Sequence, residues 1–223
     1  TTGSSYYPGP WTSTDELTEL CEVVRDVGGV YMAEPRRANP DRAFGGGGVA
    51  EVLEVGRRTG VKLHFAHFRT DQHNAGQVTE HMRLIDEAKA DGQDITLDIY
   101  PYASGSSVPI SFLPSAVQEG GPTEIVKRLA DPVQRKAIAK EMEAGLYYQR
   151  SLEEVVFSYL PNNSHLEGMS LPEIADERGV SRGEALCELL LEEDLSVGYT
   201  MPPPVSYGRW RQVSADSMQL LAR

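Results

Sequence analysis

Short apolar segments alternate with amphipathic segments over the first hundred residues, and this alternation favours an α/β fold with a parallel sheet. The clearest apolar segment is 61–69, Val-Lys-Leu-His-Phe-Ala-His-Phe-Arg, which is typical of a covered strand. Its last residues include a histidine and an arginine, His67 and Arg69. Because α/β folds place their chemistry at the carboxyl ends of strands, these two residues are the first candidates for a functional site.

The rest of the chain continues the alternation. Strands are predicted at 30–33, 61–69, 95–99, 154–160 and 196–201. Helices are predicted from Ser13 or Thr14 to Val27, and at 49–59, 76–90, 122–130, 132–143, 171–178, 181–193 and 214–222. A closed (β/α)₈ barrel takes about 250 residues, so four or five strands indicate a partial barrel. We therefore expect one partial-barrel domain over residues 1–223.

Composition excludes several classes of protein. The net charge of −12 argues against nucleic-acid binding, which needs clustered Lys and Arg. No apolar run has the length of a membrane span, and no signal peptide opens the sequence, so no membrane partner is expected. The two cysteines, Cys21 and Cys187, lie on apolar faces of predicted helices. We expect buried free thiols, as in a reducing compartment, and hence a cytoplasmic protein.

Three successive strand ends carry polar groups, and in a parallel sheet these groups share one rim. They are Glu34 with Arg36, His67 with Arg69, and Asp98 with Tyr100. A metal site on such a rim needs histidine or carboxylate ligands and an open position for water. His67 is the best candidate ligand. Glu34 either binds metal through oxygen or pairs with Arg36 or Arg69, and the residues alone favour the ion pair.

The other polar residues have plainer interpretations. His64 is an odd number of residues from His67, so it should face the helices as a hydrogen-bonded core histidine. His73 and His81 are expected to be solvated. Asp98 is expected to hold a neighbouring backbone in place. The glycines at 45–48 are not followed by the lysine of a phosphate loop, so we interpret them as a flexible lid.

Six stretches, spread over most of the chain, carry a family resemblance. Residues 98–106, Asp-Ile-Tyr-Pro-Tyr-Ala-Ser-Gly-Ser, are similar to the segment D-x-Y-P-Y-x-A-x-S/T, which is the most specific signal. Further similarities are 3–9 to G-L-x-Y-x-P-G, 28–31 to G-G-x-Y and 65–69 to I-S-H-x-K, and 129–132 and 170–175 also have counterparts. Together they resemble the D-aminoacylase family, the N-acyl-D-amino-acid deacylases of the amidohydrolase superfamily.

The resemblance implies a TIM-barrel-type metal-dependent hydrolase and a role for each matching residue. The histidine at the place of His67 binds zinc. The basic residue at the place of Arg69, usually lysine, holds the substrate carboxylate. The tyrosine at the place of Tyr100 helps to polarise the scissile carbonyl. The implied reaction is zinc-dependent hydrolysis of the amide bond of a small-molecule N-acyl-D-amino acid, and these roles agree with general metal-hydrolase chemistry.

The sequence also departs from the family pattern. Where the family has T-H-x-R, this chain has Ala33-Glu34-Pro35-Arg36, so Glu34 replaces a zinc-binding histidine. The family's H-x-H strand is expected upstream of Thr1, and its catalytic aspartate and β-sandwich strands are expected outside the chain. We therefore expect the chain to form the middle and C-terminal half of the barrel, without the N-terminal strands or the last strand. Alone it should bind zinc weakly and lack turnover.

The sequence leaves two alternatives to the deacylase. The first is a non-catalytic remnant that binds a carboxylate ligand or a partner chain, which Glu34 favours. The second is a related amidohydrolase acting on cyclic amides, similar to dihydroorotase. A partial barrel also exposes unpaired strand edges, so association into a homo-oligomer is expected.

Overall fold

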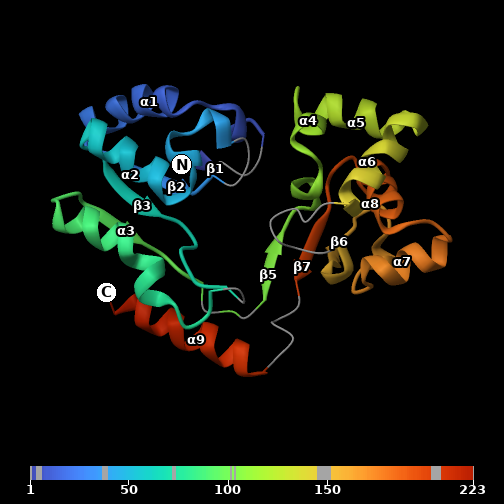
Figure 1. Cartoon of the computed structure of the whole chain (residues 1–223). Coiled ribbons are helices and arrows are strands. Elements are labelled where there is room, and N and C mark those ends of the chain that lie inside the picture. The colour runs from blue at the N-terminus through green and yellow to red at the C-terminus, as the bar shows by residue number, and fades with distance from the viewer. Residues whose placement is uncertain are drawn as a thin grey trace. The chain divides into compact units, whose positions relative to one another are not determined.

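The computed structural model describes residues 2–3, 7–36, 40–71, 74–100, 102, 104–144, 152–201 and 207–222. The chain divides into two compact units, the first made of Thr1–Ala103 with Pro204–Arg223 and the second of Ser104–Pro203 (Figure 1). The expectation of a single partial-barrel domain stays a prediction. None of the helices in the described ranges has the length and apolar character needed to cross a bilayer.

The first unit is built on a parallel sheet with strand order β1-β2-β3-β4. Its elements are β1 (Thr2–Gly3), α1 (Thr14–Asp26), β2 (Val30–Glu34), α2 (Gly48–Thr59), β3 (Lys62–Phe65), α3 (Val78–Ala90), β4 (Ile95–Leu97) and α9 (Tyr207–Leu221). Ala33 lies opposite Phe65, and Phe65 lies opposite Leu97. The predicted parallel α/β sheet is therefore confirmed, and the carboxyl ends of β2, β3 and β4 meet at one edge.

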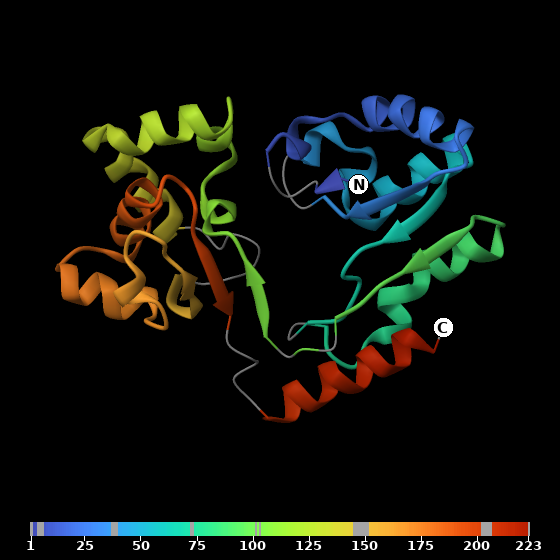
Figure 2. The ribbon, with the colours of Figure 1, turned by 180° about the vertical axis from the view of Figure 1, so that it is seen from behind.

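The helices of the first unit begin and end where local chemistry requires. The Ser13 hydroxyl accepts a hydrogen bond from the Glu16 N–H at 3.1 Å and caps α1. Gly60 ends α2 with a φ of +72°, a conformation that glycine adopts without strain. Leu63 and Phe65 are buried among the core residues of α2 and α3, so the helices cover this face of the sheet (Figure 2).

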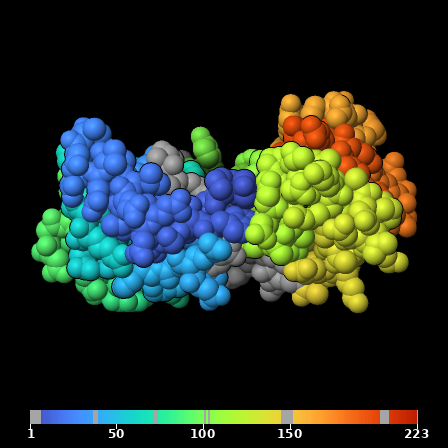
Figure 3. All heavy atoms as spheres, turned by 90° about the horizontal axis from the view of Figure 1, so that it is seen from above, coloured from blue at the N-terminus to red at the C-terminus, as the bar shows by residue number. Residues whose placement is uncertain are grey.

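The apolar residues of α1 are only partly buried. Leu17 and Cys21 face the core, as 3% and 2% exposed side chains. Leu20, Val23 and Val27 are 56%, 65% and 79% exposed, and the space-filling view shows the N-terminal residues (blue) at the surface of this unit (Figure 3). The helix thus carries one apolar stripe toward the core and another toward the outside.

Glu54 of α2 gives the first testable prediction, the pH dependence of an ion-pair network. Hydrogen bonds from Arg57 and Arg58, both at 2.7 Å, lower the pKa of Glu54 to about 2. Because the folded pKa lies below that of the unfolded chain, the stabilisation is complete above about pH 4.5 and is lost as the pH falls toward 2. Glu54→Gln should therefore cost about 1 kcal/mol near pH 7, a value limited by the exposed arginines.

The measurement for Glu54→Gln is urea unfolding of the two proteins between pH 7 and pH 3. The difference in stability should shrink below about pH 4. Glu80→Gln is the matched control, because Glu80 pairs with Arg83 on an exposed helix face and should change stability little at any pH. A difference for Glu54→Gln that stays constant down to pH 3 would contradict the assigned pKa.

The second unit contains an antiparallel sheet with strand order β5-β7-β6. Its elements are β5 (Gly105–Ser107), α4 (Ser115–Gln118), α5 (Pro122–Ala130), α6 (Pro132–Ala144), β6 (Val156–Tyr159), α7 (Leu171–Arg178), α8 (Arg182–Glu192) and β7 (Gly198–Met201). The predicted strands at 154–160 and 196–201 exist, but they pair antiparallel with each other. The expectation that they extend the parallel sheet is therefore wrong.

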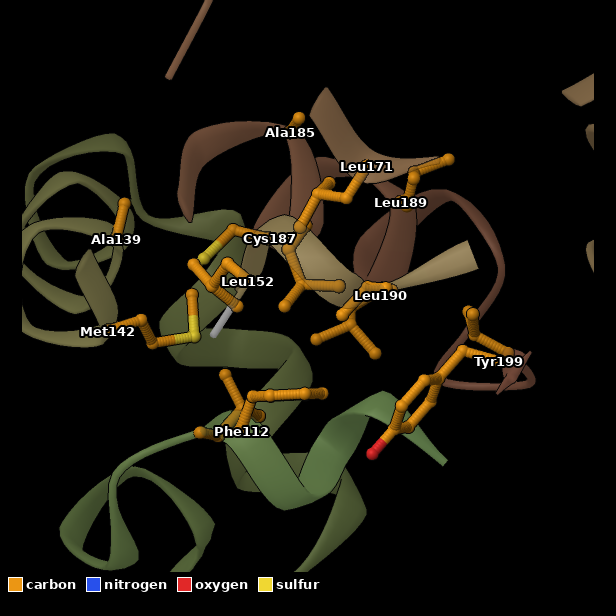
Figure 4. Close-up of a cluster of buried hydrophobic side chains, with 14 of the residues drawn as sticks. Phe112, Ala139, Met142, Leu152, Leu171, Ala185, Cys187, Leu189, Leu190 and Tyr199 are labelled. Carbon is orange, nitrogen blue, oxygen red and sulfur yellow. The ribbon is translucent and has the colours of Figure 1, made fainter. Parts of the chain in front are cut away.

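The second unit has its own hydrophobic core. Side chains from its helices and strands point toward one another in this core, among them Phe112, Met142 and Leu190 (Figure 4). The ring of Tyr199 on β7 lies 5.3 Å from the ring of Phe112. These contacts join segments that lie far apart in the sequence, so the unit is held together by non-local packing.

The expectation of buried free thiols is confirmed. Cys21 lies in the core of the first unit and Cys187 in the core of the second, and both are free. Burial raises the pKa of Cys21 to about 11 and that of Cys187 to about 12. Both thiols are therefore protonated near neutral pH and pack as small apolar groups.

The glycines at 45–48 form the turn that leads into α2. All four have positive φ angles, between +60° and +92°, which other residues adopt only at a cost. Gly47 is buried against Arg36, where an added Cβ atom would lie 3.2 Å from Arg36 Cδ. These glycines therefore provide a turn that other residues would adopt only with strain, and the flexible lid stays a prediction.

Candidate functional site

The end of β3 brings His67 to the edge of the parallel sheet. The strand ends at Phe65, and His67 has a φ of +53°, which is uncommon for a residue with a side chain. The Asp98 carboxylate accepts a hydrogen bond from the His67 backbone N–H at 2.7 Å. The prediction that Asp98 holds a neighbouring backbone is thus confirmed, and the side chain of His67 is exposed.

Asp98 is itself held by His64. His64 Nε2 lies 3.0 Å from Asp98 Oδ2, and His64 Nδ1 lies 2.7 Å from Thr96 Oγ1. Burial acts to raise the pKa of Asp98, but the hydrogen bonds from His64 and His67 outweigh it and the pKa is lowered. Asp98 is therefore ionised near neutral pH, so it accepts from both neighbours and links β3 to the end of β4.

His64 is hydrogen-bonded, as expected, but on the other face of the sheet. Leu63 and Phe65 pack against the helices, whereas His64 lies with Thr96 and Asp98 on the opposite face. The predicted orientation toward the helices is wrong. The parity argument used His67 as its reference, and β3 ends before His67, so alternation does not extend to that residue.

Arg69 and Tyr100 meet beside His67. The guanidinium carbon of Arg69 lies 4.0 Å from the centroid of the Tyr100 ring, and Arg69 Nη1 donates a hydrogen bond to the Tyr102 carbonyl. The rings of His67 and Tyr100 are 6.1 Å apart in an edge-to-face arrangement. The predicted convergence of an imidazole, a guanidinium and a phenol is therefore present, whereas the chemical role of each residue stays a prediction.

Arg36 does not pair with Glu34. Its Nε donates to Glu51 Oε2 at 2.8 Å, and both side chains are buried. Arg36 Nη1 and Nη2 also donate to the carbonyls of Pro10 and Thr12. Glu34 is half-buried at the carboxyl end of β2, next to the end of β3. Its assignment as a metal ligand stays a prediction.

The described residues supply an incomplete zinc site. Catalytic zinc sites in proteins use three side-chain ligands and one open position. Within the described ranges, no group of three or more His, Cys, Asp or Glu side chains is close enough to hold a metal ion. His67 and Glu34 stand on adjacent strand ends and can provide at most two ligands. The residues present therefore do not fit a full catalytic zinc centre.

His81 lies apart from this cluster, on α3. His81 is half-buried and stacks on Phe68 with 4.3 Å between ring centroids, so its predicted solvated role is wrong. Its Nδ1 lies 3.3 Å from Asn74 Nδ2. His73 lies outside the described residues. His81 stacks on Phe68 because α3 packs so that the His81 ring lies over the Phe68 ring. No local feature of the sequence predicts this contact.

Comparison with known proteins gives a consistent family. No protein-family model matches the chain. D-aminoacylase from Alcaligenes xylosoxydans xylosoxydans is 32% identical over 108 residues, which is 48% of this chain and 22% of that protein. N-acyl-D-glutamate deacylase from the same organism is 36% identical over 110 residues, 49% of this chain and 22% of that protein. The matched part is thus a small share of each relative.

Solved structures show the same fold. A crystal structure of D-aminoacylase, described as defining a subset of amidohydrolases, matches 99% of this chain and 36% of that chain, with a TM-score of 0.61 and 24% identity. N-acyl-D-glutamate deacylase from Bordetella bronchiseptica, solved with zinc and a phosphonate inhibitor, matches 100% of this chain and 36% of that chain, with a TM-score of 0.65 and 18% identity.

These comparisons confirm two predictions. The chain is similar to the D-aminoacylase family, as its motifs indicated. Its fold matches part of the fold of the solved D-aminoacylase and N-acyl-D-glutamate deacylase structures, and its first unit is built on a parallel α/β sheet. The chain spans about a third of the length of the solved relatives, 36% in each case.

Proposed function

We propose that the chain forms part of an amidohydrolase that cleaves N-acyl-D-amino acids, with Arg69 as the anchor for the substrate carboxylate. The observation that carries this proposal is the stack of the Arg69 guanidinium on the Tyr100 ring, at 4.0 Å, beside His67. The stack lies at the edge where the carboxyl ends of the parallel strands meet. In α/β folds this edge is where ligands bind.

The contacts of Arg69 suit the recognition of a carboxylate. A guanidinium presents five N–H donors in a planar fork that matches the two oxygens of a carboxylate. The Tyr100 ring supports one face of this plane, and the Tyr102 carbonyl accepts from Nη1. A side chain held in this way loses less conformational entropy when a ligand binds. Arginine in place of the family's lysine is therefore compatible with the same substrate class.

Tyr100 and His67 act on the other end of the substrate in this proposal. A phenol hydroxyl near the scissile carbonyl stabilises the negative charge that develops on its oxygen. His67 is exposed beside Tyr100 and supplies one imidazole. Zinc dependence is part of the proposal because a structural relative was solved with zinc. The described residues provide an incomplete ligand set for this metal.

The substrate assay tests this function directly. The panel contains N-acetyl-D-amino acids, their L enantiomers, and cyclic amides such as dihydroorotate, each added with zinc to the purified chain. Because the chain alone is expected to lack turnover, the readout is binding, measured by isothermal titration calorimetry. Tighter binding of the N-acetyl-D-amino acids than of their L enantiomers and of the cyclic amides supports the deacylase. Preference for the cyclic amides would overturn it in favour of the dihydroorotase-like alternative.

A non-catalytic role is the second candidate, and the incomplete metal cluster favours it. A remnant of this kind would bind an N-acyl amino acid through Arg69 without cleaving it. Zinc content measured after dialysis separates the two candidates, because an enzyme should retain near-stoichiometric metal. Homo-oligomer formation and the cytoplasmic location stay predictions, the first to be checked by sedimentation equilibrium.

Glu34 gives a prediction about metal affinity. If Glu34 occupies the place of a zinc ligand, Glu34→His should retain or raise the zinc content, since imidazole is a good ligand for zinc. Glu34→Ala should lower it, since one ligand is removed. The measurement is equilibrium dialysis against zinc followed by elemental analysis. A clear drop in zinc for Glu34→His would contradict the assignment of Glu34 to the metal site.

A further inference from the structure

A carboxylate from the last helix closes the loop that follows Arg69. Asp216 on α9 is fully buried. Its Oδ2 accepts hydrogen bonds from Thr70 Oγ1 and from the Gly76 N–H, both at 2.7 Å. Its Oδ1 accepts from Gln212 Nε2, also at 2.7 Å. One side chain therefore joins the start of the loop, the end of the loop and its own helix.

Asp216 acts as a charged acceptor. Burial acts to raise the pKa of Asp216, but the hydrogen bonds from Gly76, Thr70 and Gln212 outweigh it, and the pKa is lowered. The carboxyl group is therefore ionised near neutral pH. Hydrogen bonds to an ionised acceptor are stronger than those between neutral groups. The side chain has three donors for its two oxygens, which compensates for its burial.

Both neighbours of Arg69 are anchored. Phe68 on one side is buried, stacks on His81 and donates its N–H to the Asp98 carbonyl at 2.9 Å. Thr70 on the other side is fully buried and is held by Asp216. Between two fixed residues, the backbone of Arg69 has little freedom. These anchors hold the backbone from which the Arg69 side chain extends toward Tyr100.

We infer that Asp216 is a positioning residue for Arg69, acting through the hydroxyl of Thr70. The inference rests on the proposed role of Arg69 as a carboxylate anchor. It assigns a function to a helix that lies more than a hundred residues beyond the strand ends in the sequence. Figure 2 shows α9 beside α3, the helix that follows the loop. The two helices are in contact within the first unit, and this contact places Asp216 next to the loop.

The test uses the whole chain and compares four variants by NMR spectroscopy. Thr70→Val removes only the hydroxyl, with little change in shape. Asp216→Ala removes the acceptor, and Asp216→Asn keeps one oxygen that can accept from Thr70 and Gly76. Ser217→Ala is the matched control, because Ser217 is buried on the same helix and donates within it to the Val213 carbonyl.

Two readouts are taken for each variant. The ring current of Tyr100 shifts the side-chain resonances of Arg69, which stacks on that ring, so the shift reports their geometry. The second readout is the affinity for an N-acetyl-D-amino acid. Thr70→Val and Asp216→Ala should lose the shift and bind about tenfold more weakly, because a displaced guanidinium gives up roughly one hydrogen bond to the ligand carboxylate. Asp216→Asn should retain most of the Arg69 resonance shift and most of the ligand affinity. Ser217→Ala should leave the shift and the affinity unchanged.

The outcomes separate this inference from the proposed function. Unchanged Arg69 resonances in folded Thr70→Val would overturn the positioning role, even if Asp216→Ala fails to fold. A lost shift in Thr70→Val, with Ser217→Ala unchanged, supports it. If the unmodified chain binds no N-acetyl-D-amino acid but the shift still depends on Thr70, the positioning role stands and the proposed function is wrong.

Discussion

Glu51→Ala should lower the free energy of unfolding of the first unit by about 3–5 kcal/mol, the range for breaking a buried ion pair. Glu51 and Arg36 are 1% and 3% exposed, and they form two hydrogen bonds, at 2.8 Å and 3.2 Å. Without Glu51, the Arg36 charge stays buried with only carbonyl partners. The Thr14 hydroxyl, which donates to Glu51 at 2.8 Å, also loses its acceptor.

Urea unfolding followed by far-UV circular dichroism measures this loss. Glu80→Ala is the control, because Glu80 pairs with Arg83 on an exposed helix face and should change stability by less than about 1 kcal/mol. The double variant Arg36→Met with Glu51→Met should be more stable than Glu51→Ala, since it leaves no unpaired charge. A loss below about 1 kcal/mol for Glu51→Ala would contradict a structural role for this pair.

The sequence alone could not reveal this ion pair. Arg36 and Glu51 are 15 residues apart and come together across the glycine turn at 45–48. The sequence instead suggested a partner two residues away, Glu34. Nearness in sequence did not identify the partner of Arg36. Residues close together at the end of a strand can point in different directions, so they contact different neighbours. The true partner depends on how α2 packs on the sheet, which is a tertiary property.

The edge of the sheet was predictable for a simple reason. The carboxyl ends of parallel strands lie at the same edge, so His67, Arg69 and Tyr100 could be grouped once the strands were assigned. The direction in which each side chain points was harder to predict from the sequence. His64 was placed on the wrong face because the strand ends at Phe65 and His67 has a positive φ. Alternation predicts facing only within a continuous strand.

The second unit shows another limit of the sequence. The apolar segments at 154–160 and 196–201 were predicted as strands, but their antiparallel pairing was not predicted. A short apolar run has the same appearance in a parallel sheet and in an antiparallel sheet. Pairing direction is set by the connections and by the partner strand. The role of Asp216 was invisible for the same reason, since Thr70 lies 146 residues away.

Arg69→Ala should weaken the binding of N-acetyl-D-amino acids by about 10- to 100-fold, the effect of losing charge-assisted hydrogen bonds to a carboxylate. The corresponding N-acetyl-D-amino-acid amides, which lack the negative charge, should bind with unchanged affinity. The reason is that the guanidinium contacts the carboxylate end alone in the proposed arrangement. Isothermal titration calorimetry with each acid and its matched amide, at the same salt concentration, measures the difference.

Two further variants decide what the loss means. Arg69→Lys keeps the positive charge but not the planar fork, so it should recover part of the affinity, as expected from the family's lysine. Arg57→Ala removes an exposed arginine that pairs with Glu54 on α2, so it controls for the change in net charge. Equal losses for acid and amide in Arg69→Ala would show that the guanidinium supports Tyr100 and the loop rather than the carboxylate. A loss of affinity for the acid alone would show that Arg69 recognises the negative charge of the carboxylate. That result would identify the guanidinium stacked on Tyr100 as the substrate anchor.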